Sequence, residues 1–500
     1  MVRTRYAPSP TGFMHIGNLR TALFEYLIAK HDNGIFILRI EDTDQERYVD
    51  GAADAIFETL QLTGLNFDEG PGIGGEYGPY IQSERKAGYL PHAKKLVEIK
   101  KAYYCFCDKE RLLSLADENG IRRYDRYCTT LSPEEVQEKL NTEVPYVIRQ
   151  WIPEGETSFY DEVFGTITLN NKEMEDQVLI KSDGMPTYNF ANVVDDHLMA
   201  ITHVVRGSEY LTSTPKYKLL YEALDWEIPV YVHLPLLQNA SGQKISKRNG
   251  DASIKQLLEM GFLPEAIINY AALLGWSPPD NREIFSLDEL IKIFEPKNIS
   301  KSPSTFDIVK LKWVNGEHIK AMPVEEYRDM ALPFLKEAVK KPNIDYDYLA
   351  RATQSRVSIV SECAELVDFI DNLPNPDYDL NLFTHKKMKT TEEVALCALI
   401  GIWTRFGMFN DSKPKGDWNS ESLSQWITTL VEISSKSGGS AGGTALTKGQ
   451  ILWSLRTALS GKATTPCGAI EICLLLGKEE SLNRIKQAID RLKISVESNK

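Results

Sequence analysis

The first fifty residues constrain the fold of this chain more than any other stretch. Residues 2–6 alternate as a strand does, and a loop rich in proline and glycine follows at 7–18. Apolar side chains then recur every three or four positions from Leu19 to about Lys30, as on one face of a helix. Residues 35–40 are mostly apolar, which is typical of a strand buried on both faces. This order predicts a βαβ unit of an open α/β sheet, in which such a loop lies where ligands bind.

The loop at 7–18 has the composition of a phosphate-binding turn. Two prolines hold it extended, and Gly12 and Gly17 remove the Cβ atoms that would keep an anion from the backbone. His15 stands at the start of the following helix, where its ring and the unpaired N–H groups can donate to phosphate oxygens. A plain connector with a surface histidine is the alternative, because the stretch has neither a GxGxxG pattern nor a Walker lysine.

Two charged residues follow predicted strands at the edge where such sheets bind ligands. Glu41 comes directly after the second strand, so its carboxylate can hold a substrate ammonium group; a solvated acidic turn is the alternative. Arg206 follows a predicted strand at 201–205 in the same way. Opposite charges at two such ends can bind a zwitterion. Arg206 can instead pair with Asp195 or Asp196, and the sequence leaves both interpretations open.

Three of the seven cysteines cluster in the sequence, at Cys105, Cys107 and Cys128. They can offer three thiolates to a tetrahedral zinc ion, which needs a fourth ligand. No histidine lies nearby in the sequence, so Tyr124 or a water would complete the site. Three small buried thiols without a metal are the alternative. Farther on, residues 144–170 have strand-like patterns, which indicates that this region is an insertion with a small sheet of its own.

A basic segment at 241–250 ends the α/β part of the sequence. Lys244, Lys247 and Arg248 stand within five residues between two glycines, and can form a mobile positive loop over a polyphosphate. A solvated basic turn is the alternative. Beyond Asp251 the apolar periods are mostly helical. Because the formal net charge is −13, an RNA partner would have to bind local basic patches against a repelling background.

The sequence carries no signal for export or membrane insertion. Its start, Met1-Val2-Arg3-Thr4, has no hydrophobic segment, and its longest apolar run, 394–403, is too short to cross a bilayer. An odd number of cysteines argues against a disulfide framework. We therefore expect a cytoplasmic protein, with several domains because 500 residues exceed what one core holds.

The order of these motifs resembles the class I aminoacyl-tRNA synthetases. His15-Ile16-Gly17-Asn18 and Lys244-Ile245-Ser246-Lys247-Arg248 are similar to the two signature motifs of that class, with Asn18 in place of histidine and Ile245 in place of methionine. Further motifs resemble the bacterial type of glutamyl-tRNA synthetase and together span essentially the whole chain. They are Arg5–Gly12, Arg39–Asp44, Tyr188–His197, His203–Gly207, Leu446–Gln450 and Leu455–Gly461.

The resemblance implies a Rossmann-like α/β catalytic domain with a parallel sheet, an inserted α+β domain, and an all-α C-terminal half. Residues 1–103 and 188–250 would form the two halves of the catalytic domain. Residues 104–187 would form an inserted acceptor-stem-binding domain with the candidate zinc site. Residues 251–329 would form a helical stem-contact domain, and 330–500 a helical anticodon-binding domain.

The resemblance also implies the reaction and its partners. ATP, as its Mg²⁺ complex, would activate L-glutamate to glutamyl-adenylate, and the glutamyl group would pass to the 3′ end of tRNA(Glu) for protein synthesis. Charging of tRNA(Gln) stays open, and a monomer is the expected form.

Site residues are assigned by the same resemblance. The catalytic residues would be His15, Lys244 and Lys247. ATP would contact Pro8, Gly17, Asn18, Lys244 and Lys247. Glutamate would contact Arg5, Ala7, Ser9, Glu41, Tyr188, Asn192 and Arg206. Zinc would be held by Cys105, Cys107, Tyr124 and Cys128.

Three other functions fit the sequence less well. A glutamyl-queuosine-type enzyme resembles only the catalytic half, whereas about 170 residues with helical periods follow Met330 here. A glutaminyl-tRNA synthetase would end in β-barrels. A non-catalytic tRNA-binding paralogue would not need the intact signature residues, and a pyrophosphate-exchange assay would separate it from an enzyme.

Overall fold

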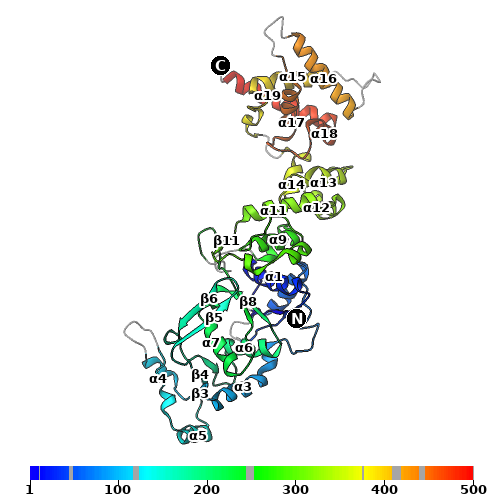
Figure 1. Ribbon diagram of the computed structural model, residues 1–500. Helices are drawn as coiled ribbons and strands as arrows, with labels where there is room; N and C mark the ends of the chain where they lie inside the picture. The colour runs from blue at the N-terminus through cyan, green and yellow to red at the C-terminus, as the bar shows by residue number, and fades with distance from the viewer. Residues whose placement is uncertain are drawn as a thin grey trace. The chain divides into compact units, whose positions relative to one another are not determined.

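The computed structural model describes residues 1–10, 12–43, 49–115, 123–243, 253–373, 377–407, 418–437 and 445–498. The chain divides into two compact units, Met1–Val314 and Asn315–Lys500. The first unit carries the strands, and the described part of the second is built from helices, so the predicted α/β region followed by a helical half is confirmed (Figure 1). Within the described residues, no helix combines the length and apolar character needed to cross a bilayer.

The N-terminal stretch forms the predicted βαβ unit. β1 (Arg3–Tyr6) pairs in parallel with β2 (Ile35–Leu38), and α1 (Ile16–His31) connects them. Leu19 and Leu23, on the apolar face of α1, are fully buried. The helical period of the sequence therefore identifies the face that packs on the sheet.

A second parallel pair lies beside this unit. β8 (His203–Gly207) pairs in parallel with β9 (Val230–Leu234). The backbone N–H of Thr202 donates to the carbonyl oxygen of Arg3 at 3.0 Å, so β8 starts next to the start of β1. The two pairs belong to separate sheets, but the carboxyl ends of β1 and β8 both reach the same pocket.

The inserted region divides its strands between two sheets. β3 (Ala102–Cys105), β4 (Val147–Gln150) and β7 (Val178–Ile180) form an antiparallel sheet of their own. β5 (Glu156–Asp161) and β6 (Gly165–Asn170) form a hairpin, and the end of β5 pairs in parallel with β9. The sequence predicts strands in this region but assigns them only to a separate sheet. The hairpin instead extends the sheet of β8 and β9, through a long-range pairing that a local pattern does not reveal.

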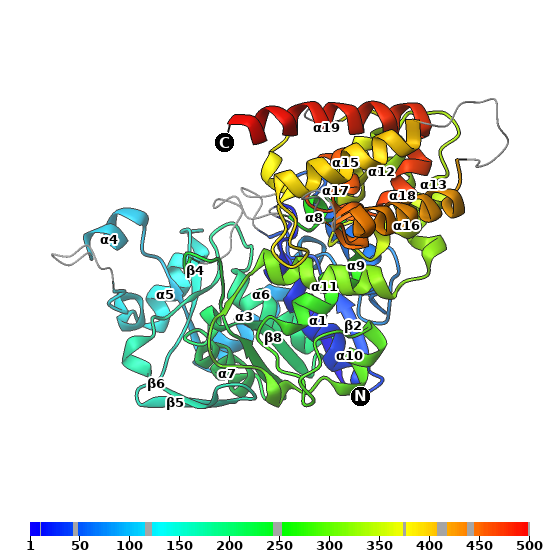
Figure 2. The ribbon, with the colours of Figure 1, turned by 90° about the horizontal axis from the view of Figure 1, so that it is seen from above.

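The remaining helices and strands of the first unit surround or follow these sheets. The helices are α2 (Ala52–Leu62), α3 (Lys86–Glu98), α4 (Lys109–Ser114), α5 (Pro133–Asn141), α6 (Tyr188–Leu198), α7 (Thr214–Ala223), α8 (Ile254–Glu259), α9 (Pro264–Leu273) and α10 (Leu287–Ile293). Two short strands, β10 (Leu237–Gln238) and β11 (Ser304–Thr305), pair in parallel. Figures 1 and 2 both show α4 and α5 at the end of this unit away from α1.

The second unit is a set of packed helices. They are α12 (Val324–Ala338), α13 (Tyr346–Gln354), α14 (Glu362–Val367), α15 (Glu392–Gly407), α16 (Ser420–Ser437), α17 (Lys448–Ser460), α18 (Ala469–Leu476) and α19 (Lys478–Ser498), while α11 (Ile308–Ala321) runs from the first unit into the second. α15 packs against α17 and α19. Ile485, Ile489 and Leu492, which share one face of α19, are buried, and Leu482 on the same face is half-buried.

Candidate active site

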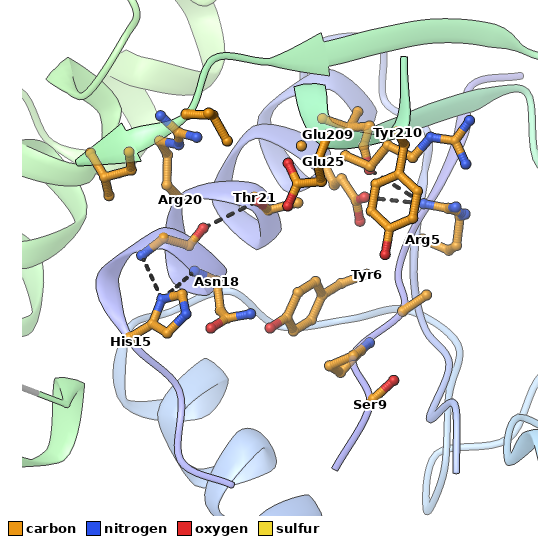
Figure 3. Close-up of a pocket in the computed structure, with 18 of the residues that line it drawn as sticks. Arg5, Tyr6, Ser9, His15, Asn18, Arg20, Thr21, Glu25, Glu209 and Tyr210 are labelled. Carbon is orange, nitrogen blue, oxygen red and sulfur yellow. Dashed lines mark hydrogen bonds and ion pairs between the residues drawn. The ribbon is translucent and has the colours of Figure 1, made fainter. Parts of the chain in front are cut away.

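A pocket of about 350 Å³ opens at the carboxyl ends of β1 and β8. Its walls come from the N-terminal loop, from α1, and from the segments that follow β8 and β9. Figure 3 shows His15 and Asn18 on one side of the pocket and Arg5 and Tyr210 on the other. The structure therefore brings the first signature motif and five of the seven predicted amino acid ligands to one cavity, namely Arg5, Ala7, Ser9, Tyr188 and Arg206.

Most of the predicted site residues line this pocket. They are Arg5, Ala7, Pro8, Ser9, His15, Gly17, Asn18, Tyr188 and Arg206. Glu41 and Asn192 are not among the described residues that line it, although both are only 2 % exposed. The burial of Glu41 excludes the alternative of a solvated acidic turn. Lys244 and Lys247 lie outside the described residues.

His15 caps the first turn of α1. Its Nδ1 accepts hydrogen bonds from the backbone N–H groups of Gly17 at 3.1 Å and Asn18 at 3.2 Å (Figure 3). A Cβ atom at Gly17 would lie 3.1 Å from the His15 ring, so glycine lets the ring fold back onto the helix. Because Nδ1 accepts, the proton of the neutral ring is on Nε2. The N–H groups of Gly17 and Asn18 are thus used in the cap, and the helix start offers an anion the imidazole Nε2–H and the positive end of the helix dipole.

Buried charges form a network at the wall of the pocket. Oδ1 of Asp196 accepts from Nε of Arg5 and from Nη1 of Arg39, each at 2.8 Å. Oε1 of Glu25 accepts from Nη1 of Arg5 at 3.2 Å. Oε1 of Glu41 accepts from Nη2 of Arg39 at 2.9 Å. Arg5 and Arg39 are therefore already paired with carboxylates.

Burial acts in the same direction on the three carboxyl groups of this network, but their final pKa values shift differently. It raises the pKa of Glu25 well above the usual range and also raises the pKa of Glu41, against the opposing charges of the arginines. Burial would raise the pKa of Asp196 too, but Arg5 and Arg39 outweigh it and hold that pKa below its usual range. Asp196 is thus the carboxylate that the two arginines stabilise most.

Arg206 has a different environment from Arg5. Its Nε donates to Nε2 of His233 at 3.2 Å, and its Nη2 donates to Oγ1 of Thr214 at 2.9 Å. The rings of three tyrosines surround the guanidinium, with centroids 4.6 to 5.6 Å from Cζ. They are Tyr210, Tyr217 and Tyr231. Among the described residues no carboxylate pairs with Arg206.

The sequence left open an ion pair of Arg206 with Asp195 or Asp196, and that alternative is wrong. Oδ1 of Asp195 instead accepts from Nε of Arg85 at 2.6 Å, while Asp196 pairs with Arg5 and Arg39.

Buried polar atoms beside the pocket lack partners. Oε2 of Glu41, Nδ2 of Asn192 and Nη1 of Arg206 have no hydrogen-bond partner among the described residues. Each such atom costs about 1–3 kcal/mol when it stays unpaired, so the group is expected to meet a ligand. Oε2 of Glu25 and Nε of Arg20, in two residues that line the pocket, also have no partner among the described residues. Unpaired acceptors together with unpaired donors match a molecule that carries both an ammonium and a carboxylate group.

The clustered cysteines come together in the insertion. The Sγ atoms of Cys105, Cys107 and Cys128 all lie within 4.8 Å of one another. Sγ of Cys105 donates to the Tyr124 hydroxyl at 3.3 Å, and Sγ of Cys107 lies 3.6 Å from it. Three thiols and a phenol oxygen are a donor set that fits zinc.

Sequence reasoning did not single out several residues that build this site. Glu25 and Arg39 are charged residues inside apolar stretches, and that exception to the pattern is the signal that could have found them. Arg20 is another. Its Nη1 donates to the carbonyl oxygen of Leu274 at 3.1 Å and its Nη2 to that of Pro235 at 2.6 Å. Burial lowers the pKa of Arg20 to about 10.

Comparison with known protein families gives two matches. The catalytic-domain model of class I tRNA synthetases (E and Q) matches residues 1–313, and an anticodon-binding-domain model matches residues 326–489. A glutamate–tRNA ligase of Clostridium kluyveri is 53% identical over 504 residues, which cover 100% of this chain and 99% of the relative. One of Clostridium novyi is 53% identical over 500 residues, with 99% of both chains covered.

The solved structures that resemble this chain agree with the sequence matches. A glutamate tRNA ligase from Elizabethkingia meningosepticum, crystallised in complex with its amino acid, superposes with a TM-score of 0.83 at 34% identity. A glutamate-tRNA synthetase from Elizabethkingia anophelis superposes with a TM-score of 0.84 at 34% identity. Each comparison covers 98% of this chain and 99% of the other.

Proposed function

The chain belongs to the class I tRNA synthetases (E and Q), among the glutamate–tRNA ligases, and from this premise we propose how its pocket performs the reaction. The pocket binds ATP and L-glutamate side by side, forms glutamyl-adenylate, and passes the glutamyl group to the 3′ end of tRNA(Glu). The observation that carries this assignment is the unpaired Nη1 of the buried Arg206, a positive charge without a carboxylate partner among the described residues. Cytoplasm and a monomeric state remain expectations from the sequence.

Glutamate is complementary in charge to the pocket. It has two carboxylates and one ammonium group, and the proposed ligands include two arginines and one carboxylate, Arg5, Arg206 and Glu41. Arg206 takes one substrate carboxylate, and the unpaired Oε2 of Glu41 accepts from the ammonium. Ala7, Ser9, Tyr188 and Asn192 complete the proposed set. The last two lie one turn apart on α6, so they share a face.

Adenylate formation needs no protein nucleophile. A carboxylate oxygen of glutamate attacks the α-phosphorus of ATP, a new P–O bond forms, and the bond to pyrophosphate breaks. The rate then depends on alignment and on positive groups near the departing pyrophosphate. In this proposal the Nε2–H of His15 and the N-terminus of α1 stabilise the phosphates, beside Pro8, Gly17 and Asn18.

The basic segment at 241–250 supplies the remaining positive charge in this mechanism. Lys244 and Lys247 lie outside the described residues, and they remain proposed ligands of the β- and γ-phosphates. Mg²⁺ enters as part of the ATP complex and shares that role.

A zinc ion in the insertion is part of the proposal. Cys105, Cys107 and Cys128 would hold it, with Tyr124 or a water as the fourth ligand. The ion would link β3 to the segment around Tyr124 and would take no part in adenylate chemistry. Metal analysis of the purified protein should find one equivalent of zinc, and Cys128→Ser should lose it. Wild-type protein without zinc would refute this site.

Pyrophosphate exchange in the presence of glutamate, ATP and tRNA tests the function itself. An enzyme exchanges label into ATP in a glutamate-dependent way. A non-catalytic paralogue binds tRNA without exchange, and that result would overturn the proposal. Charging of purified tRNA(Glu) and tRNA(Gln), side by side, then decides whether tRNA(Gln) is a second acceptor.

A further inference from the structure

His233 and Asp161 form a buried pair next to Arg206. In the parallel register of β8 and β9, Arg206 lies opposite His233. Nδ1 of His233 lies 2.6 Å from Oδ2 of Asp161, the last residue of β5. Arg206 is 6 % exposed, and His233 and Asp161 are fully buried. A continuous chain of hydrogen bonds therefore runs from the hairpin of the insertion to the guanidinium in the pocket.

The contacts fix the protonation state of His233. Arginine has only donors, so Nε2 of His233 must accept from Arg206 and the ring must be neutral. The ring proton is then on Nδ1, from which it is donated to Asp161. Burial lowers the pKa of His233, and Asp161 opposes that shift only in part. A neutral ring at physiological pH agrees with the geometry.

Asp161 is itself firmly held. Its Oδ1 accepts from the backbone N–H groups of Val163 at 3.0 Å and Phe164 at 2.8 Å. Its Oδ2 also accepts from the backbone N–H of His233 at 3.0 Å. The carboxylate can therefore orient the imidazole without moving.

We propose that Asp161 and His233 are positioning residues for recognition of the side-chain carboxylate of glutamate. Asp161 fixes the tautomer of His233, and His233 together with Thr214 holds two edges of the Arg206 guanidinium, so that Nη1 stays unpaired for the substrate. This inference rests on the proposed function, in which Arg206 is a glutamate ligand.

Neutral partners matter because they hold Arg206 without cancelling its charge. Arg5 is held by Asp196 and Glu25, so its charge is shared with protein carboxylates. His233 and Thr214 are neutral, and the full charge of Arg206 is left for the ligand. A charged carboxylate gains more from such a donor than the neutral amide of glutamine does. The arrangement thus favours glutamate over glutamine.

The variant Asp161→Asn tests the proposal. Asparagine keeps an oxygen for Val163 and Phe164, but its NH₂ group faces Nδ1 of His233 and favours the other tautomer. The Nε2–H of that tautomer would then oppose the Nε–H of Arg206. We expect the KM for glutamate to rise by at least about tenfold, the loss typical of one charge-assisted hydrogen bond, while the KM for ATP changes less than about twofold.

A spectroscopic measurement adds an outcome that a merely structural role would not produce. In ¹⁵N-imidazole spectra, wild-type His233 should show the Nδ1–H tautomer, and Asp161→Asn should shift it to Nε2–H. The signal is assigned by its loss in His233→Gln. That variant also carries an amide oxygen that can accept from Arg206, so its KM for glutamate should rise less than that of His233→Phe.

Asp176→Asn is the matched control. Asp176 is a buried aspartate of the same insertion, and it accepts from the Tyr103 hydroxyl and from Arg126. This variant should leave the KM for glutamate unchanged. Thermal unfolding checks that each variant is folded. If Asp161→Asn is unfolded, the comparison of His233→Gln with His233→Phe tests the proposal instead.

The outcomes separate this inference from the proposed function. If Arg206→Ala raises the KM for glutamate but Asp161→Asn changes neither that KM nor the tautomer, the positioning role is overturned and the pocket assignment stands. If Arg206→Ala leaves the KM for glutamate unchanged, the pocket assignment fails and the positioning role fails with it.

Discussion

Charged side chains at this pocket are held in two ways. Arg5 and Arg39 pair with buried carboxylates, whereas Arg206 contacts neutral groups among the described residues. An arginine that is already paired gains less from another carboxylate, because its charge is partly neutralised. Arg206 should therefore contribute more to glutamate affinity than Arg5.

The first prediction concerns this difference. Arg206→Ala should raise the KM for glutamate by about 10- to 100-fold, since a charge-assisted hydrogen bond to a buried ligand contributes about 1.5–3 kcal/mol. The KM for ATP should change much less. Pyrophosphate exchange at varied glutamate and varied ATP measures both. Arg282→Ala is a control, because that arginine is exposed and pairs with Asp280. Equal effects of Arg206→Ala on both substrates would contradict the role.

The second prediction is a pH dependence of stability caused by His233. Its pKa is lowered in the folded protein, so the unfolded chain takes up a proton near pH 6.5 while the folded protein does not. The free energy of unfolding of the wild type should therefore fall relative to that of His233→Gln as the pH decreases below 6.5. The difference should grow by roughly 1.4 kcal/mol per pH unit until the folded ring is protonated.

Urea denaturation between pH 8 and pH 5.5 measures the difference in the free energy of unfolding between wild type and His233→Gln. The variant is a suitable reference because its glutamine side chain does not titrate. A difference that is independent of pH would show that the pKa of His233 is the same in both states.

At the residue level, the sequence predicts which charges stand at strand ends, but it does not predict their partners. Arg206 is recognisable because it follows a strand pattern and a family motif. Its contacts with Thr214 and His233 depend on the register of two strands and on a helix start. Asp196 lies 191 positions from Arg5, and only the folded sheet brings them together.

At the level of elements, Arg20 connects three parts of the first unit. It lies in α1 and donates to carbonyl oxygens at the end of α9 and just after β9. β10 follows Pro235 and leads toward the lysine segment at 241–250. The guanidinium therefore holds Pro235, just before β10, against the helix that His15 caps.

The third prediction follows from this connection. Arg20→Met keeps the side-chain length but leaves the carbonyl oxygens of Leu274 and Pro235 without their donors. We expect a loss of about 1–3 kcal/mol in the free energy of unfolding. The KM for ATP should also rise, because Arg20 and Pro235 both line the pocket beside the helix start that His15 caps. Denaturant unfolding and pyrophosphate exchange measure the two effects. Unchanged stability together with an unchanged KM for ATP would contradict the role, and Arg282→Met is the exposed control.

Elements with a strong local period are predictable, and pairings between distant strands are not. The helix predicted from Leu19 to about Lys30 is α1, which begins three residues earlier because His15 caps its first turn. The β5–β6 hairpin has a clear alternating pattern, yet it joins the sheet of β8 and β9 only through contact with β9. That contact places Asp161 beside His233, so the positioning pair could not be found from sequence.

At the level of the whole molecule, the net charge is negative, although one buried arginine at the pocket has no carboxylate partner among the described residues. The chain carries a formal charge of −13, and the buried arginine is Arg206 of the proposed glutamate pocket. Binding of tRNA, a polyanion, must rely on exposed basic side chains that salt screens. In the proposed site, glutamate would contact buried groups, whose charges salt screens much less.

The fourth prediction uses this contrast. Raising KCl from 50 mM to 200 mM should weaken tRNA binding by roughly tenfold or more, since each phosphate contact releases counterions and binding falls steeply with salt. Over the same range the KM for glutamate, measured at saturating tRNA, should change by less than about twofold, because Arg206 is 6 % exposed. Filter binding of labelled tRNA and pyrophosphate exchange give the two quantities. If the KM for glutamate rose as steeply as the dissociation constant for tRNA, the amino acid would be bound at a solvent-exposed, screened site, and the pocket between α1 and β8 could not be where it is recognised.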